Sequence, residues 1–273
     1  MSNVAGVADK LFTGSIAGIY DAFLVPLIFE PYARDLSQRL VRRSIGNVLE
    51  IAAGTGVVTR ELASRLPPSI AIVATDLNEP MLERASSIGT SRAVEWRQAD
   101  AMQLPFASAS FDAVVCQFGV MFFPDKARAF AEARRVLRAG GVFIFSVWDR
   151  LAENEFAQEV TDALAELFPA NQPRFMERVP HGYHDAEPIA RDLESGGFAK
   201  RPDMALVAAR SRAESARIAA IAYCQGTPLR NEIEARNGLL AEVTDVVTGR
   251  LARRFGSASV DGKIQALVVS VDG

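Results

Sequence analysis

Acidic side chains and glycines that could bind one ligand occur in a fixed order in the first half of the chain. Glu50 ends a short apolar run, and Gly54 and Gly56 follow it in a turn of small residues. Asp76 and Asp100 each follow a later segment that is typical of a strand. Glycines allow positive φ and close approach of a ligand to the backbone, and the amides of a helix that begins there attract a polar or anionic group.

This spacing favours a ligand that contains a nucleoside. Ligands of open parallel sheets bind beyond the carboxyl ends of the strands, so Asp76 could accept hydrogen bonds from two ribose hydroxyls and Asp100 one from an adenine amine. Glu50 would repel a diphosphate but attract an amine, and the residues after Gly56 lack the third glycine of the GxGxxG fingerprint. The three carboxylates therefore match a ligand with an ammonium, a ribose and an adenine, which describes S-adenosylmethionine.

The elements that must position these residues are alternating strands and helices. Helical spacing is clear over 57–66, and a helix predicted over 124–138 should end at Gly140-Gly141. Ser211 and Glu214 have the spacing of a capping box ahead of a further helix. Strands are expected at 47–52, 70–75, 94–97, 113–116, 142–147, 204–209 and 264–271. This alternation predicts an α/β fold with a mainly parallel sheet.

Five segments together resemble a known family. They are LEIAAGTG (49–56), ATDLNEPML (74–82), QADAMQLPFASASFD (98–112), VVCQFGVMFFPD (114–125) and RVLRAGGVFIFSVWD (135–149). In order and spacing they resemble the class I S-adenosylmethionine-dependent methyltransferases, in the small-molecule group related to the ubiquinone/menaquinone-biosynthesis enzymes. The resemblance implies a Rossmann-like, seven-stranded sheet whose last strand is antiparallel, with S-adenosyl-L-methionine as cofactor. Ala52 stands where the family's loop usually has its first glycine, and we expect it to fit there with a negative φ.

The resemblance also implies which residues contact the cofactor. Glu50 should lie near the amino group or brace the loop, Asp76 should bind the ribose, and Gln117 and Phe118 should lie nearest the sulfonium methyl. Two other interpretations remain open, because Met81 could be core filler and Glu50 a partner of the helix dipole. The full predicted set is Tyr20, Glu50, Ala52, Gly54, Gly56, Asp76, Leu77, Met81, Asp100, Ala101, Gln117 and Phe118.

Methyl transfer from a sulfonium mainly requires alignment of the nucleophile and exclusion of water, so a dedicated catalytic residue is not essential. A base helps when the acceptor must lose a proton. The chain has 2 histidines, His181 and His184 in the sequence HGYHD, and we predict that His184 is the base. Its segment could instead be a strand end and a helix cap. The sequence shows no carboxylate–Asn cluster of the kind that would indicate a metal site. Cys116 is expected to be a buried apolar residue.

The predicted organisation is an N-terminal helical lid segment (1–45) and a methyltransferase domain (46–273) with helical insertions at about 151–180 and 211–256. With 30 Lys+Arg against 33 Asp+Glu, the chain has no cationic excess for nucleic acid or an anionic membrane surface. Its 2 cysteines form no disulfide framework, and the apolar stretch 16–29 is too short to span a bilayer. We therefore expect a cytoplasmic monomer or homodimer.

The expected reaction moves a methyl group to oxygen, rather than nitrogen or carbon, of a small, partly hydrophobic molecule by in-line displacement without metal. An NAD(P)-dependent oxidoreductase is the main alternative, but the YxxxK pair typical of one such class does not occur. A non-catalytic module that binds an adenosine cofactor is the third alternative.

Overall fold

The computed structural model describes residues 16–273, which form two compact units. We call residues 30–147, 183–207 and 267–273 the sheet unit, and the remaining described residues, 16–29, 148–182 and 208–266, the helical unit. The strands are β1 (Asn47–Glu50), β2 (Ala71–Asp76), β3 (Glu95–Gln98), β4 (Phe111–Gln117), β5 (Leu137–Trp148), β6 (Asp203–Ala213) and β7 (Val260–Asp272).

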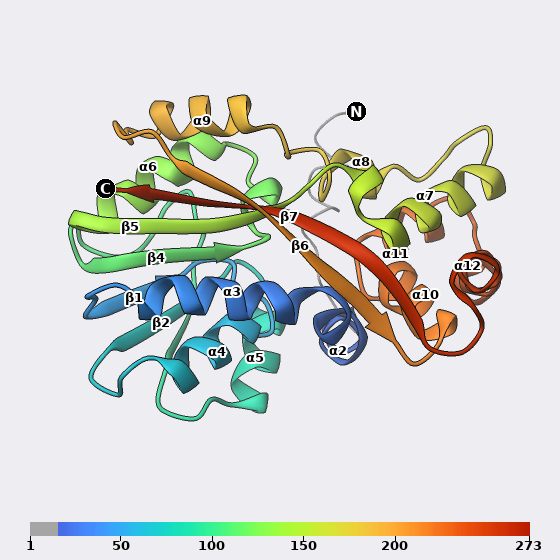
Figure 1. Ribbon diagram of the computed structural model, residues 1–273, viewed down its shortest axis with the longest axis horizontal. Helices are drawn as coiled ribbons and strands as arrows, with labels where there is room; N and C mark the ends of the chain where they lie inside the picture. The colour runs from blue at the N-terminus through green and yellow to red at the C-terminus, as the bar shows by residue number, and fades with distance from the viewer. Residues whose placement is uncertain (1–15) are drawn as a thin grey trace. The chain divides into compact units, whose positions relative to one another are not determined.

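The strands form a 7-stranded sheet in the order β3-β2-β1-β4-β5-β7-β6 (Figure 1). β1 pairs in parallel with β2 and β4, β2 with β3, and β4 with β5. β7 runs antiparallel to its neighbours (Figure 1). The predicted fold class, a mainly parallel Rossmann-like sheet with an antiparallel last strand, is therefore confirmed.

Helices cover both faces of the sheet in the sheet unit. They are α3 (Glu30–Val41), α4 (Val57–Arg65), α5 (Glu79–Ile88), η2 (Val120–Phe122), α6 (Lys126–Val136) and α9 (Ala186–Ser195). On one face, α3 and α4 bury an apolar cluster that includes Leu36, Leu62, Val48 and Ile144. On the opposite face, Phe143 and Phe145 of β5 pack against Phe130 of α6. Alternate residues of a strand point to opposite faces, so the continuous apolar runs of the central strands are what a sheet buried on both faces requires.

The helical unit packs its own helices around a second core. They are α2 (Ile16–Ile19), η1 (Tyr20–Phe29, a π-helix), η3 (Leu151–Glu153), α7 (Glu155–Leu167), α8 (Phe175–Arg178), α10 (Ala216–Gln225), α11 (Leu229–Glu234) and α12 (Leu240–Phe255). α10 contacts η1 and α12, and α12 contacts α7. Arg250 and Arg254 of α12 donate to Glu159 of α7. Burial raises the pKa of Glu159, but these two guanidiniums lower it by more, so the net shift is downward.

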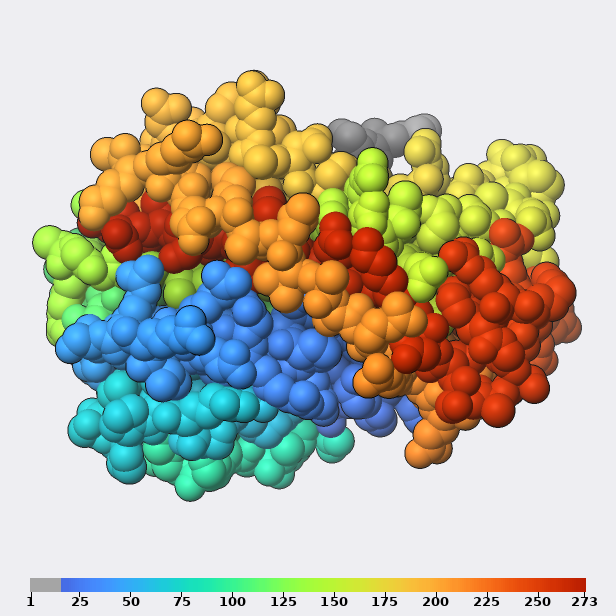
Figure 2. Space-filling view, viewed as in Figure 1, coloured from blue at the N-terminus to red at the C-terminus, as the bar shows by residue number. Residues whose placement is uncertain are grey.

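The structure corrects two sequence predictions about elements. α6 ends at Val136 and β5 begins at Leu137, so Gly140-Gly141 lies within a strand and not at a helix end. Ser211 lies in β6, and Ser215 is the residue that caps α10 by accepting a hydrogen bond from the Ile218 amide. β6 is an edge strand that reaches the surface (Figure 2), and its partly exposed residues extend past the point where the capping spacing placed a helix start.

The N-terminal helical segment is longer than the apolar stretch in the sequence. Among the described residues, one continuous helical segment, Ile16–Val41, is long and apolar enough by length and composition to cross a membrane. Within its most apolar window, 50% is buried in the protein, as in a core helix. Cytoplasmic localisation stays a prediction.

Candidate functional site

Polar side chains lie near the carboxyl ends of four strands, on one face of the sheet. Val48, Ile72, Val115 and Ile144 belong to the apolar cluster under α3 and α4, each on a different strand. Because alternate residues share a face, the same rows continue toward the carboxyl ends of the strands. There they reach Glu50 on β1, Asp76 on β2, Gln117 on β4 and Ser146 on β5. The structure thus brings three of the predicted site residues to one edge and one face.

Glu50 is a carboxyl group in an apolar setting. It is 1% exposed, and the Thr59 hydroxyl at the start of α4 donates a 2.6 Å hydrogen bond to its Oε2. Burial raises the pKa of Glu50 from 4.5 to about 8, against the opposing effects of Thr59 and Arg60. The side chain therefore braces the loop and is mostly protonated at pH 7.

Asp76 fastens the glycine turn to β2. Its Oδ2 accepts a 2.8 Å hydrogen bond from the Gly54 amide, and its Oδ1 accepts one of 2.8 Å from the Asn78 amide. The side chain is 6% exposed, and burial raises its pKa although these amides oppose the shift. A carboxylate that holds two backbone segments in place is positioned before any ligand arrives.

Gly56 and Ala52 both adopt left-handed backbone conformations in this loop. Gly56 has φ +82°, and a Cβ there would lie 2.8 Å from the Trp96 ring. Ala52 has φ +54°, so the expectation of a negative φ was wrong. Its methyl group fits because the facing residue is Gly119, where an added Cβ would lie 2.5 Å from the Ala52 Cβ.

The loop after β4 has a second strained residue. Phe118 has φ +51°, is 5% exposed and packs edge-on against Tyr32 of α3, with ring centroids 5.1 Å apart. The Phe118 amide donates to the Ser146 carbonyl at 3.1 Å, directly after the register pair Gln117↔Ser146. Non-glycine residues in this region cost about 1–3 kcal/mol each and cluster at functional sites. The ring of Phe118 thus serves packing, and its backbone shapes the edge.

The residues predicted for the adenine lie in two settings. Leu77 is 48% exposed beside Asp76, whereas Met81 is 3% exposed and belongs to the core. Asp100 closes a turn, because its Oδ1 accepts a 2.8 Å hydrogen bond from the Met102 amide. Ala101 is 9% exposed next to it. Their contacts with an adenine remain predictions.

Comparisons with known proteins agree with this geometry. The methyltransferase-domain family matches residues 49–145. The ubiquinone/menaquinone biosynthesis C-methyltransferase UbiE of Enterobacter sp. (strain 638) is 30% identical over 191 residues, which are 66% of this chain and 69% of that protein. The chain belongs to the class I S-adenosylmethionine-dependent methyltransferases. The predicted family and the cofactor, S-adenosyl-L-methionine, are therefore confirmed for this methyltransferase.

Two further relatives define the extent of the likeness. UbiE of Pasteurella multocida (strain Pm70) is 31% identical over 164 residues, 56% of this chain. The chain spans 57% of the length of that relative. BH2331 of Bacillus halodurans C-125, described as a candidate methyltransferase, is 19% identical with a TM-score of 0.55, covering 88% of this chain and 97% of that one. The likeness to BH2331 shows a shared fold.

The two histidines of the methyltransferase fall in different units. His184, the predicted base, is in the sheet unit, and its Nε2 lies 3.4 Å from the carboxylate of Asp185, whose side chain is 72% exposed. His181 is in the helical unit, 5% exposed, with Nδ1 2.8 Å from the Asp149 carbonyl oxygen. Tyr20 also lies in the helical unit, on η1, where its ring centroid is 5.2 Å from that of Phe29. Neither His184 nor Tyr20 is shown at the cofactor edge, and their roles remain predictions.

Other residues near the strand ends were missed by sequence reasoning. Thr55 Oγ1 and Ser146 Oγ are buried and make no hydrogen bond in the part of the chain that the structure describes. Ser146 had a signal, since it is the polar residue in the apolar run VFIFSVW. Thr59 had none, because a threonine in a first helical turn is ordinary. The Cys116 thiol is 0% exposed and burial raises its pKa well above the usual range, in line with the predicted apolar role.

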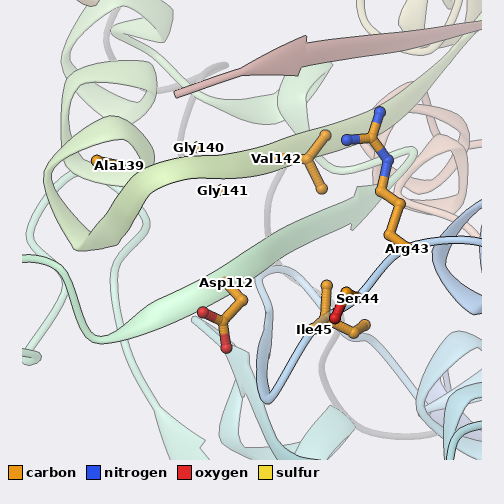
Figure 3. Close-up of a pocket in the computed structure, with 8 residues that line it drawn as sticks. All are labelled: Arg43, Ser44, Ile45, Asp112, Ala139, Gly140, Gly141 and Val142. Atoms are coloured by element: carbon orange, nitrogen blue, oxygen red, sulfur yellow. The ribbon is translucent and has the colours of Figure 1, made fainter.

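A pocket of about 340 Å³ lies at the opposite end of the central strands (Figure 3). Asp112 points into this region from the start of β4, but its carboxylate already accepts from the Gly46 and Asn47 amides and from Arg138. Arg43 donates to Asp272 at 3.1 Å. These charged groups thus join the amino ends of β1, β4 and β5 and the carboxyl end of β7. Within residues 16–273, no group of three or more His, Cys, Asp or Glu side chains is placed to hold a metal ion.

Proposed function

We propose that the protein transfers a methyl group from S-adenosylmethionine to a small, partly hydrophobic acceptor that carries an aromatic hydroxyl. The observation that carries the proposal is the pair of buried carboxyl groups at the ends of β1 and β2, one of which already holds the glycine turn through Gly54. When bound, the cofactor supplies an electrophilic methyl group on a sulfonium with a good leaving group.

The residues present fit this cofactor. Gly54 is partly exposed and offers bare backbone, whereas Gly56 is packed against Trp96 and shapes the turn. The buried Thr55 hydroxyl lacks a hydrogen bond among the described residues, which a polar ligand group would supply. Asp76 would accept from the ribose hydroxyls, and Glu50 would pair with the ammonium. Leu77, exposed beside Asp76, would cover the adenine. These side chains bind and orient, which is the main requirement of the reaction.

The acceptor atom is either carbon or oxygen of the hydroxy-aromatic acceptor. Both UbiE relatives named above are C-methyltransferases of ubiquinone and menaquinone biosynthesis, which favours a ring carbon. Oxygen is the atom predicted from the sequence. Both reactions proceed from the ionised hydroxyl, because ionisation raises the electron density of the oxygen and of the ring carbons next to it. We place carbon first on the strength of the relatives' names.

Calorimetric titration with S-adenosylmethionine, S-adenosylhomocysteine and NADH tests the cofactor site. Binding of the first two and no binding of NADH is expected, and the reverse pattern would favour the oxidoreductase. Methyl transfer from isotope-labelled S-adenosylmethionine to substituted phenols and naphthols, with NMR of the product, then identifies the atom. Cofactor binding with no transfer to any of these acceptors would contradict the proposed acceptor class and favour a non-catalytic module.

A further inference from the structure

Residues 99–110 connect β3 to β4 and carry Asp100, the predicted acceptor of the adenine amine; we call them the adenine loop. The loop begins at the cofactor edge, because the Ala99 amide donates to the Asp76 carbonyl at 3.0 Å. Asp100 then accepts two hydrogen bonds from the residues that follow it. The Met102 amide donates to its Oδ1 at 2.8 Å, and the Gln103 amide donates to its carbonyl oxygen at 2.9 Å. The direction of the Asp100 carboxylate therefore depends on where the next part of the loop lies.

Two charged side chains of α6 hold that next part by its backbone. The Leu104 amide donates a 2.7 Å hydrogen bond to Glu132 Oε2. Arg135 donates to the Leu104 carbonyl at 2.9 Å and to the Phe106 carbonyl at 2.7 Å. Both backbone groups of Leu104 are thus bound by one pair of side chains, which lies entirely within the sheet unit.

The pair of Glu132 and Arg135 is itself fixed in a bidentate geometry. Arg135 Nε donates to Glu132 Oε1 and Arg135 Nη2 to Glu132 Oε2, each at 2.7 Å. The two side chains are only 20% and 33% exposed. Arg135 lowers the pKa of Glu132, and Glu132 raises the pKa of Arg135, so both remain ionised. An exposed ion pair contributes little by itself, but this one orients two groups that bind the loop.

The helix that carries the pair is packed firmly on the sheet. Phe130 and Ala133, on either side of Glu132 in the chain, are 0% exposed. The Phe130 ring lies 5.7 Å from Phe143 and 5.4 Å from Phe145 of β5, between ring centroids. A binding residue on a loop needs rigid support of this kind to keep its direction.

We infer that Glu132 and Arg135 are positioning residues that fix the direction of the Asp100 carboxylate and thereby make the cofactor site selective for adenine; this rests on the proposed function. They act through the backbone of Leu104 and Phe106 and touch neither the cofactor nor the acceptor. Their effect is on the recognition of the base, and the alignment of the methyl group with its acceptor does not depend on them.

The test compares the binding of two ligands by calorimetry. S-adenosylhomocysteine carries the adenine amine, whereas S-inosylhomocysteine has a carbonyl oxygen at the same position. The wild-type protein should prefer the first by about 10–100-fold, because a carboxylate accepts from the amine and faces an oxygen in the other ligand. Asp100→Asn should lose this preference, since an asparagine that keeps the Met102 amide on Oδ1 presents its Nδ2 to the base.

The deciding variant is Glu132→Gln. Glu132 uses both oxygens, and glutamine has only one, so either the Leu104 amide or Arg135 loses its acceptor. The preference should fall to about threefold or less, because a hydrogen bond weakens steeply when its geometry is lost. The affinity for S-inosylhomocysteine should change little, which a general loss of structure would not allow.

Glu61→Gln is the matched control. Glu61 of α4 pairs with Arg65 at 2.6 Å and is 24% exposed, so it is an ion pair of similar length and exposure on another helix of the sheet unit. This variant should keep the preference of the wild-type protein. Arg128→Met is a milder second variant, which removes the 3.1 Å hydrogen bond from the Arg128 side chain to the Met102 carbonyl. It should lower the preference about threefold and decides the question if urea unfolding shows that Glu132→Gln does not fold.

The outcomes separate this inference from the proposed function. An unchanged preference in Glu132→Gln, an equal loss of affinity for both ligands, or the same loss in Glu61→Gln would overturn the inference. Equal binding of both ligands by the wild-type protein would also overturn it and would leave methyl transfer standing. No binding of S-adenosylhomocysteine by the wild-type protein would contradict the proposed function itself.

Discussion

The replacement Glu50→Gln should stabilise the folded protein and lower its affinity for S-adenosylmethionine. Glutamine keeps an oxygen for the Thr59 hydroxyl and removes a carboxyl group whose pKa is raised from 4.5 to about 8. In the unfolded chain Glu50 loses its proton near pH 4.5, whereas in the folded protein it keeps the proton until about pH 8. Rising pH therefore favours the unfolded chain over this range.

The size of the effect follows from the shift. At 1.36 kcal/mol for each pKa unit, Glu50 costs the folded state at most about 3 kcal/mol at pH 7 and under about 1 kcal/mol at pH 5. Urea unfolding of the ligand-free protein should therefore show Glu50→Gln more stable than wild type by a margin that grows by about 2 kcal/mol between these pH values. Glu95→Gln, at an exposed position on β3, is the matched control. A margin that does not grow with pH would refute the argument.

Cofactor binding supplies the second half of the test. If the ammonium of S-adenosylmethionine pairs with Glu50, the carboxyl group must ionise, and binding at pH 7 should release close to one proton. Calorimetry in two buffers of different ionisation enthalpy measures this release, which Glu50→Gln should abolish. The affinity of the wild-type protein should rise about tenfold between pH 6 and pH 7, because ionisation becomes less costly by about 1.4 kcal/mol. Equal proton release by both proteins would show that Glu50 only braces the loop.

Three further replacements test the site and the helical unit. Asp76→Ala should lower S-adenosylmethionine affinity about a hundredfold or more by calorimetry and lower the unfolding free energy by about 1–3 kcal/mol, because the Gly54 amide loses its acceptor. Gly119→Ala should destabilise by about 1–3 kcal/mol in urea, since the new methyl group meets Ala52; Gly249→Ala in α12, where a Cβ would lie 3.8 Å from the Arg253 side chain, should not. Glu159→Gln should flatten the loss of stability on acidification from pH 6 to pH 3 followed by circular dichroism, because the lowered pKa of Glu159 stabilises the fold above pH 4.5 and this stabilisation is lost as pH falls. Unchanged affinity, an equal response of the two glycine variants, or parallel acid curves would contradict the respective predictions.

The alternation of strands with helices and the acidic ends of two strands could be predicted from the sequence because short-range patterns determine both. The runs around Glu50 and Asp76 are apolar, end in an acid and are followed by turn residues, and parallel pairing brings such ends to one edge. The limits of β5 and β6 could not be predicted in the same way. Gly140 is typical of a helix terminator, yet the helix ends earlier and the glycine takes φ +77° inside the strand. Local spacing indicates only a preference for a helix that ends at the glycines, and the pairing of β5 with β4 overrides this preference.

The sequence predicted the site less well at residues whose role depends on tertiary packing. His181 and His184 are equivalent in the sequence, and only the fold buries one against Asp149 and leaves the other beside an exposed carboxylate. Ser146 stands out in its apolar run, but its place beside Gln117 at the end of the apolar face follows only from the register of β4 and β5. These distinctions depend on contacts between segments far apart in the chain, which periodicity does not record.

Ala52 stands where the family's loop usually has a glycine, and it shows how contacts between distant segments can accommodate a substitution in a binding loop. A left-handed alanine costs about 1–2 kcal/mol relative to glycine, so the residue needs compensation. The compensation lies on another strand's loop, where Gly119 leaves room for the Ala52 methyl group and the Cys116 sulfur closes the space from the other side, 2.7 Å from where a Gly119 Cβ would be. The loops after β1 and β4 therefore fit one another as a pair, and the backbone that would face the cofactor keeps the shape that a glycine usually provides. Neither residue alone predicts this, because alanine at one position is tolerated only through glycine at the other.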